Sequence, residues 1–428
     1  MTNPSEETME KKRWIVVVGA LLVQLCLGAL YAWGAFTKAL QDPAGPFAFS
    51  ATQAQAIFSA ALAAFAFTMI FAGRWQDKAG PRKVALTGGA VLGLGYLLAG
   101  TVGGTSFWAL LATVGILGGI GVGLAYVCPI ASCMKWFPDL KGFVVGLSVA
   151  GFGAGAFIFV KLAGPWANLI AAQGVNGTFT VFGIIFLAGV VLGALLLSNP
   201  PAGWKPANWT PKAAAASTGA AEDFTQGETV RTTSFWLLWL AYVCAAGAGL
   251  MVIGCVKNYG ELECSLSAAV AGSALGLLAL FNGLGRIVWG TISQKLGARR
   301  AIALNGALQA LMLFAVYQLG RSELAVTIAA CWVGFNFGGN LALFPLVTAE
   351  SFGTKYLGAN YGAMFTAYGV GGIIMPLLAG RVYDVLGSHF WAFVAAGIAC
   401  VIAMLLALVV RAPHHAASRA GNPAYEAS

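Results

Sequence analysis

The sequence predicts an all-α membrane protein with twelve transmembrane helices in two six-helix pseudo-repeats. Of its 428 residues, 59% are hydrophobic and only 9% are charged, which is far less charge than a soluble protein of this length carries. Apolar runs of about 20 residues, long enough to cross a bilayer, recur along the whole chain. The 57 glycines indicate helices that approach one another closely.

The first predicted span follows a polar and then basic stretch, MTNPSEETMEKKRW. The apolar segment after it has no A-x-A-like cleavage site at its end, so we interpret it as a transmembrane helix and not as a signal peptide. The other spans are the apolar runs between short polar loops. The predicted spans are 14–38, 51–73, 84–103, 107–134, 142–170, 177–198, 234–257, 267–292, 299–320, 323–349, 361–384 and 389–411.

Segment 199–233 interrupts this series of apolar runs. It is rich in Pro, Ala, Gly and Thr and has no apolar run long enough to span a bilayer, which is typical of a linker. We therefore divide the chain into a six-helix half at 1–198, a cytoplasmic linker at 199–233, a six-helix half at 234–411 and a cytoplasmic tail at 412–428.

The positions of the basic residues predict the orientation in the membrane. Of the 24 Lys and Arg residues, 18 lie in the ends and loops on the side of the N-terminus. Both termini are therefore expected to be cytoplasmic, in a prokaryotic cell membrane. Because these residues lie in short loops between spans, the net charge of +9 is a topology signal and does not indicate a nucleic-acid partner.

Two loops of the first half are repeated in the second half. GRWQDKAGPRK at 73–83 follows the second predicted span, and GTISQKLGARR at 290–300 follows the eighth, an offset of 217 residues. WFPDLKG at 136–142 has a fainter counterpart, SFGTKYLG at 351–358, at an offset of about 215. Two loops that repeat at nearly one spacing indicate a duplicated six-helix unit.

The pattern G-x-x-x-D-x-x-G-x-R-K after the second span resembles the signature of the major facilitator superfamily. Asp77 and Arg82 fit the motif, whereas the second copy has Gln294 in place of the usual Asp. The resemblance implies the major facilitator fold and a gate on the cytoplasmic side, where the carboxylate caps a helix and pairs with basic residues. The alternative is a solvated basic loop that only sets the topology.

Arg286 is the exceptional charge of this sequence. No Asp or Glu lies in the middle of a predicted span, which argues against a cationic substrate. Lys38, Lys161 and Lys257 lie near the outer ends of spans and can extend to the interface. Arg286 lies deep in the eighth predicted span, where a charge costs about 2.5–3.5 kcal/mol.

Arg286 and Asn282 share a helix face because they are four residues apart, and Gly285 leaves room beside them. A guanidinium offers a planar fork that binds both oxygens of a carboxylate and does not deprotonate. The pair therefore predicts a receptor for an anion that the substrate brings. The alternative is an arginine that packs against helix-end carbonyl groups.

Five further segments resemble the oxalate:formate antiporter family and, more loosely, monocarboxylate transporters: LGALYAW at 27–33, KWFPDLKG at 135–142, NGLGRIVWG at 282–290, FGGNLALFP at 337–345 and GANYG at 358–362. The resemblance implies that Arg286 binds a substrate carboxylate. The lysine that binds a second carboxylate in the oxalate carrier corresponds to Tyr368 here. It also implies pocket positions at Tyr31, Tyr126, Phe337, Leu341 and Phe365.

With one fixed cation, these positions favour a small monoanion such as lactate, pyruvate, acetate, formate or glycolate. Monocarboxylate transporters carry an Asp as proton site where this chain has Asn282, which cannot titrate. Three alternatives stay open for the proton. It is carried by a lysine, for which Lys38 is the candidate, or it travels with the undissociated acid, or the protein exchanges one anion for another.

We therefore expect a monomeric secondary active transporter that carries a small monocarboxylate anion, and a proton if it is coupled, across a lipid bilayer by alternating access. Glycine-rich segments such as GILGGIGVG at 115–123 and GFGAGAF at 151–157 favour such motion. The alternatives are an oxalate:formate-type exchanger and a membrane sensor without transport. No nucleophile–base pair or metal-ligand spacing indicates an enzyme, a cofactor or a metal site, and the eight cysteines fit small packing residues.

Overall fold

The computed structural model describes residues 4–206, 222–411 and 413, and in this part of the chain the secondary structure is helical throughout. The first half contains α1 (Pro4–Leu27), η1 (Gly28–Trp33), α2 (Gly34–Gln41), α3 (Ala51–Ala79), α4 (Pro81–Thr101), α5 (Phe107–Leu110), η2 (Leu111–Leu117), α6 (Gly118–Trp136), α7 (Lys141–Ala163) and α8 (Leu169–Leu196). The second contains α10 (Gln226–Thr229), α11 (Thr233–Asn258), η3 (Tyr259–Glu263), α12 (Ala268–Leu296), α13 (Ala298–Ala315), α14 (Glu323–Phe352), α15 (Leu357–Leu386) and α16 (Phe390–Val409).

Within the described residues, eleven helical stretches are long and apolar enough to cross a membrane. The first of them joins α1, η1 and α2, and the fourth joins η2 with the α-helices on either side. The eighteen-residue helix α13 is more polar and occupies the ninth predicted position, between α12 and α14. The predicted all-α fold of twelve spans is confirmed.

The predicted boundaries between the fifth and sixth spans are wrong. The fifth span was expected to reach residue 170, but α7 ends at Ala163 and α8 begins at Leu169. The chain turns at Gly164 and Pro165, and Asn168 takes a left-handed conformation with φ of 49°. Hydropathy did not reveal this turn, because the residues on both sides of it are apolar and hydropathy alone does not report a Gly-Pro break.

The duplicated loop appears in the structure as a duplicated turn. Gly80 separates α3 from α4 with φ of 85°, and Gly297 separates α12 from α13 with φ of 81°. Both lie in the left-handed range that residues with a Cβ atom rarely adopt. The sequence offset of 217 residues therefore marks two equivalent tight turns between helices.

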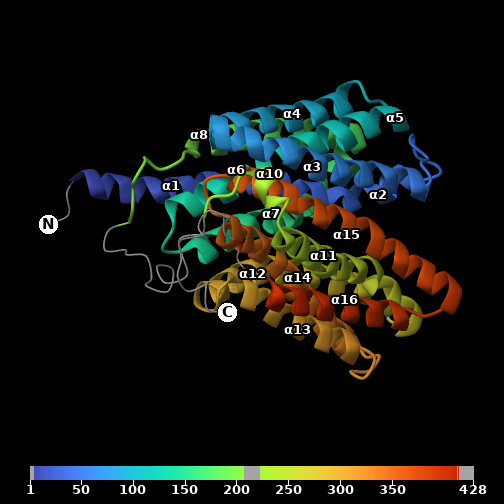
Figure 1. The fold of residues 1–428 in the computed structure, drawn as a ribbon. Coiled ribbons are helices and arrows are strands. Elements are labelled where there is room, and N and C mark those ends of the chain that lie inside the picture. Colours follow the sequence, from blue (N-terminus) through green and yellow to red (C-terminus); the bar gives the residue numbers. More distant parts are fainter. Residues whose placement is uncertain (1–3, 207–221, 412, 414–428) are drawn as a thin grey trace.

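The helices form two bundles, one from α1–α8 and one from α11–α16, which lie together at one end and diverge toward the other (Figure 1). We call the first the termini end, because α1 begins there and Ser234 at the start of α11 donates its hydroxyl proton to the carbonyl of Arg411 (2.8 Å). We call the opposite end the far end. A Cβ on Gly142 would lie 1.9 Å from the carbonyl oxygen of Gly290, so α7 and α12 meet backbone to backbone.

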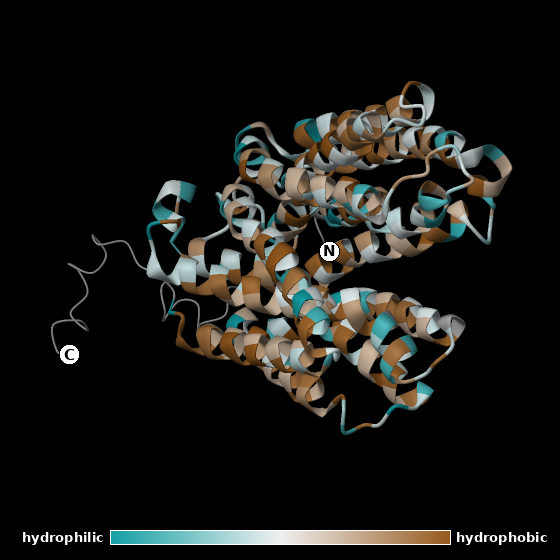
Figure 2. Cartoon of the chain, turned by 90° about the vertical axis from the view of Figure 1, so that its right-hand side faces the viewer, coloured by the Kyte–Doolittle hydropathy of each residue, from teal (hydrophilic) through white to brown (hydrophobic). Residues whose placement is uncertain are grey.

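The outward faces of the bundles carry large apolar side chains. Phe67, Leu311 and Leu377 are each more than 60% exposed. In Figure 2, which looks onto the far end, hydrophobic residues run along the helices of both bundles. Such surfaces are stable in contact with lipid and unstable in water, as expected of helices that span a membrane.

The turn at Gly297 generates a prediction about stability. Gly297→Ala places a Cβ in the left-handed conformation and is expected to cost about 1–2 kcal/mol, lowering the melting temperature of the detergent-solubilised protein. Gly276→Ala is the matched control, because Gly276 lies inside α12 with open space around its Cα. The control should stabilise by about 0.5–1 kcal/mol. Equal melting temperatures for both variants would contradict the role of Gly297.

Candidate functional site

Arg286 lies in α12 and is only 1% exposed. The helix packs directly on α14, because a Cβ on Gly285 would lie 1.8 Å from the carbonyl oxygen of Phe335. On its other side α12 meets α7, where a Cβ on Gly146 would lie 2.3 Å from the carbonyl oxygen of Arg286 itself. The arginine is thus placed at the contact between the two bundles.

The guanidinium of Arg286 is held by uncharged groups. Its Nε and Nη2 donate to the side-chain oxygen of Asn282 (3.2 and 2.8 Å), and its Nη1 donates to the carbonyl oxygen of Val149 in α7 (2.7 Å). It also lies 5.8 Å from the ring centroid of Phe152. Among the described residues no carboxylate forms a salt bridge with it. These contacts occupy three of the five N–H donors of a guanidinium and leave its charge uncompensated.

A cluster of aromatic side chains from both bundles adjoins this arginine through Phe152. The rings of Tyr31 and Tyr126 contact Phe152 edge to face, with centroids 5.3 and 5.5 Å away. Phe365 packs on Tyr126 (5.4 Å) and stacks on Tyr368 (5.0 Å). The structure therefore brings four of the predicted pocket residues into one aromatic cluster, which contacts Phe152 through Tyr31 and Tyr126.

The remaining predicted residues differ in their placement. Phe337 stacks on Tyr368 at 6.4 Å, and Leu341 lies buried one helical turn further along α14. The hydroxyl groups of Tyr31 and Tyr368 form a hydrogen bond that joins the two bundles. Lys38 is exposed, in the last turn of α2, and forms no described contact with the group around Arg286.

Sequence reasoning missed several residues of this site. Phe152 and the carbonyl of Val149 contact Arg286, yet the segment GFGAGAF was interpreted only as a source of mobility. Gly153 lies beside the guanidinium, because a Cβ there would lie 3.7 Å from the guanidinium carbon, an ordinary van der Waals distance. Tyr242, stacked on Phe344 at 3.9 Å and 6.1 Å from Tyr368, had no signal in the sequence.

The motif residues Asp77 and Arg82 lie at the termini end and are not partners of each other. Asp77 of α3 accepts hydrogen bonds from the backbone N–H groups of Gly358 and Ala359 (3.2 and 2.8 Å), which cap α15 of the other bundle. Lys135 lies 4.0 Å from the same carboxylate. Arg82 is exposed, and its Nε donates to the carbonyl oxygen of Leu197 (3.3 Å).

A second polar cluster lies at the far end, within the bundle of α11–α16. Glu263 accepts hydrogen bonds from the hydroxyl of Tyr317 (2.5 Å) and from both the backbone N–H and the Nδ1 of His389 (2.6 Å each). Burial by itself raises the pKa of Glu263, but these hydrogen bonds and the charge of His389 outweigh burial, so the pKa is lowered. The cluster therefore joins η3 to the segment that follows α13 and to the start of α16.

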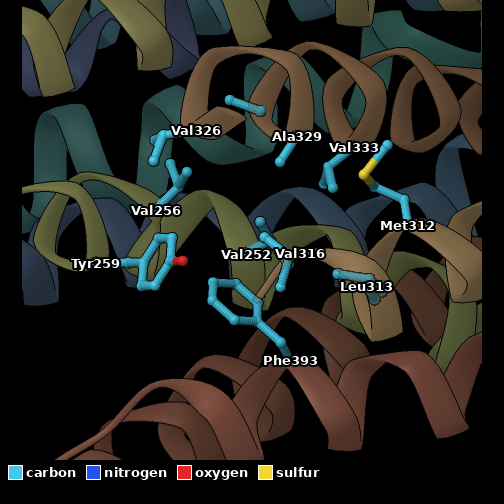
Figure 3. Close-up of a pocket in the computed structure, with 11 residues that line it drawn as sticks. Val252, Val256, Tyr259, Met312, Leu313, Val316, Val326, Ala329, Val333 and Phe393 are labelled. Atoms are coloured by element: carbon cyan, nitrogen blue, oxygen red, sulfur yellow. The ribbon is translucent and has the colours of Figure 1, made fainter. Parts of the chain in front are cut away.

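The pocket drawn in Figure 3 is not this site. It is lined by apolar side chains of α11, α14, α16 and the end of α13, among them Val252, Leu313, Val333 and Phe393, with Tyr259 at its edge. None of the residues predicted to bind a substrate lines it. It is a packing gap inside one bundle and offers no charge to an anion.

Two bundles of membrane-spanning helices with a buried cation at their contact are the architecture of a membrane transporter. Residues 13–376 and 265–426 match the Major Facilitator Superfamily, and the chain belongs to this family of transporters.

The chain is 29% identical to the oxalate:formate antiporter of Oxalobacter formigenes, over 93% of this chain and 91% of that protein. It is 25% identical to monocarboxylate transporter 13 of Rattus norvegicus, over 94% and 89% of the two chains. Among solved structures, the fucose:proton symporter of E. coli superposes with a TM-score of 0.66 at 17% identity, covering 93% of this chain and 99% of that one. The last comparison supports the fold alone.

The contact between Arg286 and Asn282 predicts an energetic coupling. Asn282→Leu removes the oxygen that accepts two guanidinium hydrogen bonds, so the protein should be destabilised by about 1–3 kcal/mol. In an Arg286→Met background the same substitution should cost little, because no buried charge is left without its acceptor. Thermal unfolding of the four proteins in detergent measures the coupling. Additive effects of the two substitutions would contradict this geometry.

Proposed function

We propose that this protein is a secondary active transporter of small monocarboxylates of the lactate and pyruvate type. The observation that carries the proposal is Arg286, a buried guanidinium with unused N–H donors and no acidic partner among the described residues. A carboxylate would supply two oxygens for these donors and the missing negative charge. The substrate would thus complete an ion pair that the protein leaves open.

The residues around Arg286 support a small and partly apolar substrate. Tyr126, Phe337, Leu341 and Phe365 are all buried and offer mostly carbon surface. Tyr368 stands at the position of the second cation of the oxalate carrier and brings a hydroxyl group in place of a charge. One fixed positive charge in an apolar setting matches a monoanion with a short tail. The names of the relatives, an oxalate:formate antiporter and a monocarboxylate transporter, point to the same chemical class.

The proposed mechanism is alternating access by rocking of the halves 1–198 and 234–411 about the site. The termini end would face the cytoplasm of a cell, and closure there would involve Asp77, which caps α15 from the opposite bundle, with Lys135 nearby. Arg82 would support this gate indirectly, by binding the end of α8. The transporter would act as a monomer in the lipid bilayer.

Proton coupling is part of the proposal, with Lys38 as the candidate proton carrier. Lys38 is exposed at the far end of the first span. Asn282, at the position of the titrating Asp of monocarboxylate transporters, holds no titratable proton. If Lys38 carries the proton, Lys38→Ala would abolish gradient-driven accumulation while leaving exchange of substrate across the membrane.

Exchange of oxalate for formate is a second candidate function. It is favoured by the similarity to the oxalate:formate antiporter, which extends over 93% of this chain. Counterflow of labelled oxalate into vesicles preloaded with formate would reveal it.

Uptake of labelled L-lactate into proteoliposomes, with and without an inward proton gradient, tests the proposal. Uptake driven by the gradient is expected, with complete loss in Arg286→Ala. Arg286→Lys should lower uptake roughly 10- to 100-fold, because a point charge does not replace the bidentate fork. Arg381→Lys, at an exposed arginine of α15, is the matched control and should transport normally.

Two results of this experiment would contradict parts of the proposal. Full uptake by Arg286→Lys would contradict the fork-binding role of the guanidinium. Uptake that requires vesicles preloaded with another anion would identify an exchanger, and the oxalate and formate experiment would then decide between the two candidate functions.

A further inference from the structure

Residues 222–229 of the linker run across the termini end of the second bundle, and we call this segment the strap. The backbone N–H of Phe224 donates to the carbonyl oxygen of Phe352 at the end of α14 (3.0 Å). The side-chain amide of Asn360 in α15 donates to the carbonyl oxygen of Phe224 (2.9 Å). The strap is therefore bound to both helices that border the loop between α14 and α15.

Side chains reinforce this attachment. Asp223 accepts a hydrogen bond from the backbone N–H of Lys355 in the same loop (3.0 Å). The ring of Phe224 is buried and lies 6.1 Å from the ring of Phe352. With backbone bonds, a carboxylate and an aromatic contact, the strap is fixed to the second bundle and moves with it.

Gln226 connects the strap to both bundles. It is the first residue of α10, which lies between the bundles in Figure 1, and it is 7% exposed. Its Nε2 donates to the carbonyl oxygen of Ala359 in α15 (2.6 Å), and its Oε1 accepts a hydrogen bond from Nε of Arg74 in α3. Asp77, one turn after Arg74, accepts from the N–H of the same Ala359. Gln226 thus binds the carbonyl group of Ala359, and Asp77 binds the N–H group of the same residue at the gate.

We propose that Gln226 is a positioning residue for the gate at the termini end, and that the strap is a latch which favours the closed gate. When the bundles part at this end, the strap stays with the second bundle, so the hydrogen bond between Gln226 and Arg74 breaks in every cycle. Without Gln226, the closed gate loses one bond between the bundles and leaves the carbonyl of Ala359 without this donor. The equilibrium then shifts toward the state that is open at the termini end.

Distances between spin labels at the termini end measure this shift. Lys83 and Arg300 are exposed and occupy equivalent positions of the repeat in the two bundles, so Lys83→Cys and Arg300→Cys carry the labels. Cys244 and Cys331, the two native cysteines that are only half-buried, are replaced by serine. Double electron–electron resonance on the full-length protein in lipid nanodiscs, without substrate, gives the populations of short and long distances.

Gln226→Met should increase the long-distance population about five- to tenfold, the effect of losing roughly one hydrogen bond. Gln226→Glu should give a smaller increase, because its carboxylate still accepts from Arg74 but cannot donate to Ala359. Gln173→Met, at an exposed glutamine of α8, is the matched control and should not change the distances.

Arg74→Met removes the same bond from the opposite bundle and is the second variant. A shift in Gln226→Met or Arg74→Met that the control does not share supports the latch. An unchanged distance distribution in both variants overturns it. Because no substrate is present, the outcome is independent of whether the transported solute is a monocarboxylate.

Discussion

The structure is organised around a positive charge that the protein itself does not neutralise. Arg286 is buried between the two bundles, and its guanidinium is held by an amide oxygen, a backbone carbonyl and an aromatic ring. Such dipoles orient the guanidinium and lower the free-energy cost of burying its charge, but they do not neutralise that charge. A cation kept in this condition has unused binding capacity for an anion. Among the described residues no Asp or Glu forms a salt bridge with Arg286, so in the proposed function a solute supplies that anion.

The helices that hold the two bundles together at the termini end also carry the residues of the candidate site around Arg286. Arg286 belongs to α12, whose backbone touches α7 at Gly146, and Phe365 and Tyr368 belong to α15, whose first turn is capped by Asp77 of α3. Any rotation of one bundle against the other therefore changes the spacing between the guanidinium, Phe152 and the tyrosines. In the proposed mechanism, occupancy of the site and closure of the gate depend on each other through these two helix pairs.

The sequence was sufficient for features that depend on local pattern. Hydropathy predicted the spans, and helical spacing placed Asn282 beside Arg286. The offset of 217 residues predicted a duplicated loop, and the structure shows a turn at Gly80 in one copy and at Gly297 in the other. Features that depend on distant segments were not predictable. The carbonyl of Val149, the attachment of Arg82 to Leu197 and the bond from Arg74 to Gln226 join residues far apart in the chain. No periodicity reports which helix a side chain will face.

The charge balance of the closed site bears on the choice of substrate. A bound monocarboxylate and Arg286 together carry no net charge, so a site closed at both ends would bury a neutral ion pair. A dicarboxylate would leave one negative charge in the same apolar surroundings, where Tyr368 offers a hydroxyl group in place of a second cation. Burying an unpaired charge is far more costly than burying a matched pair. This difference in the cost of desolvation favours a monoanion as the substrate of the proposed cycle. For the same reason the empty site, with its unpaired guanidinium, is the state least suited to closure at both ends.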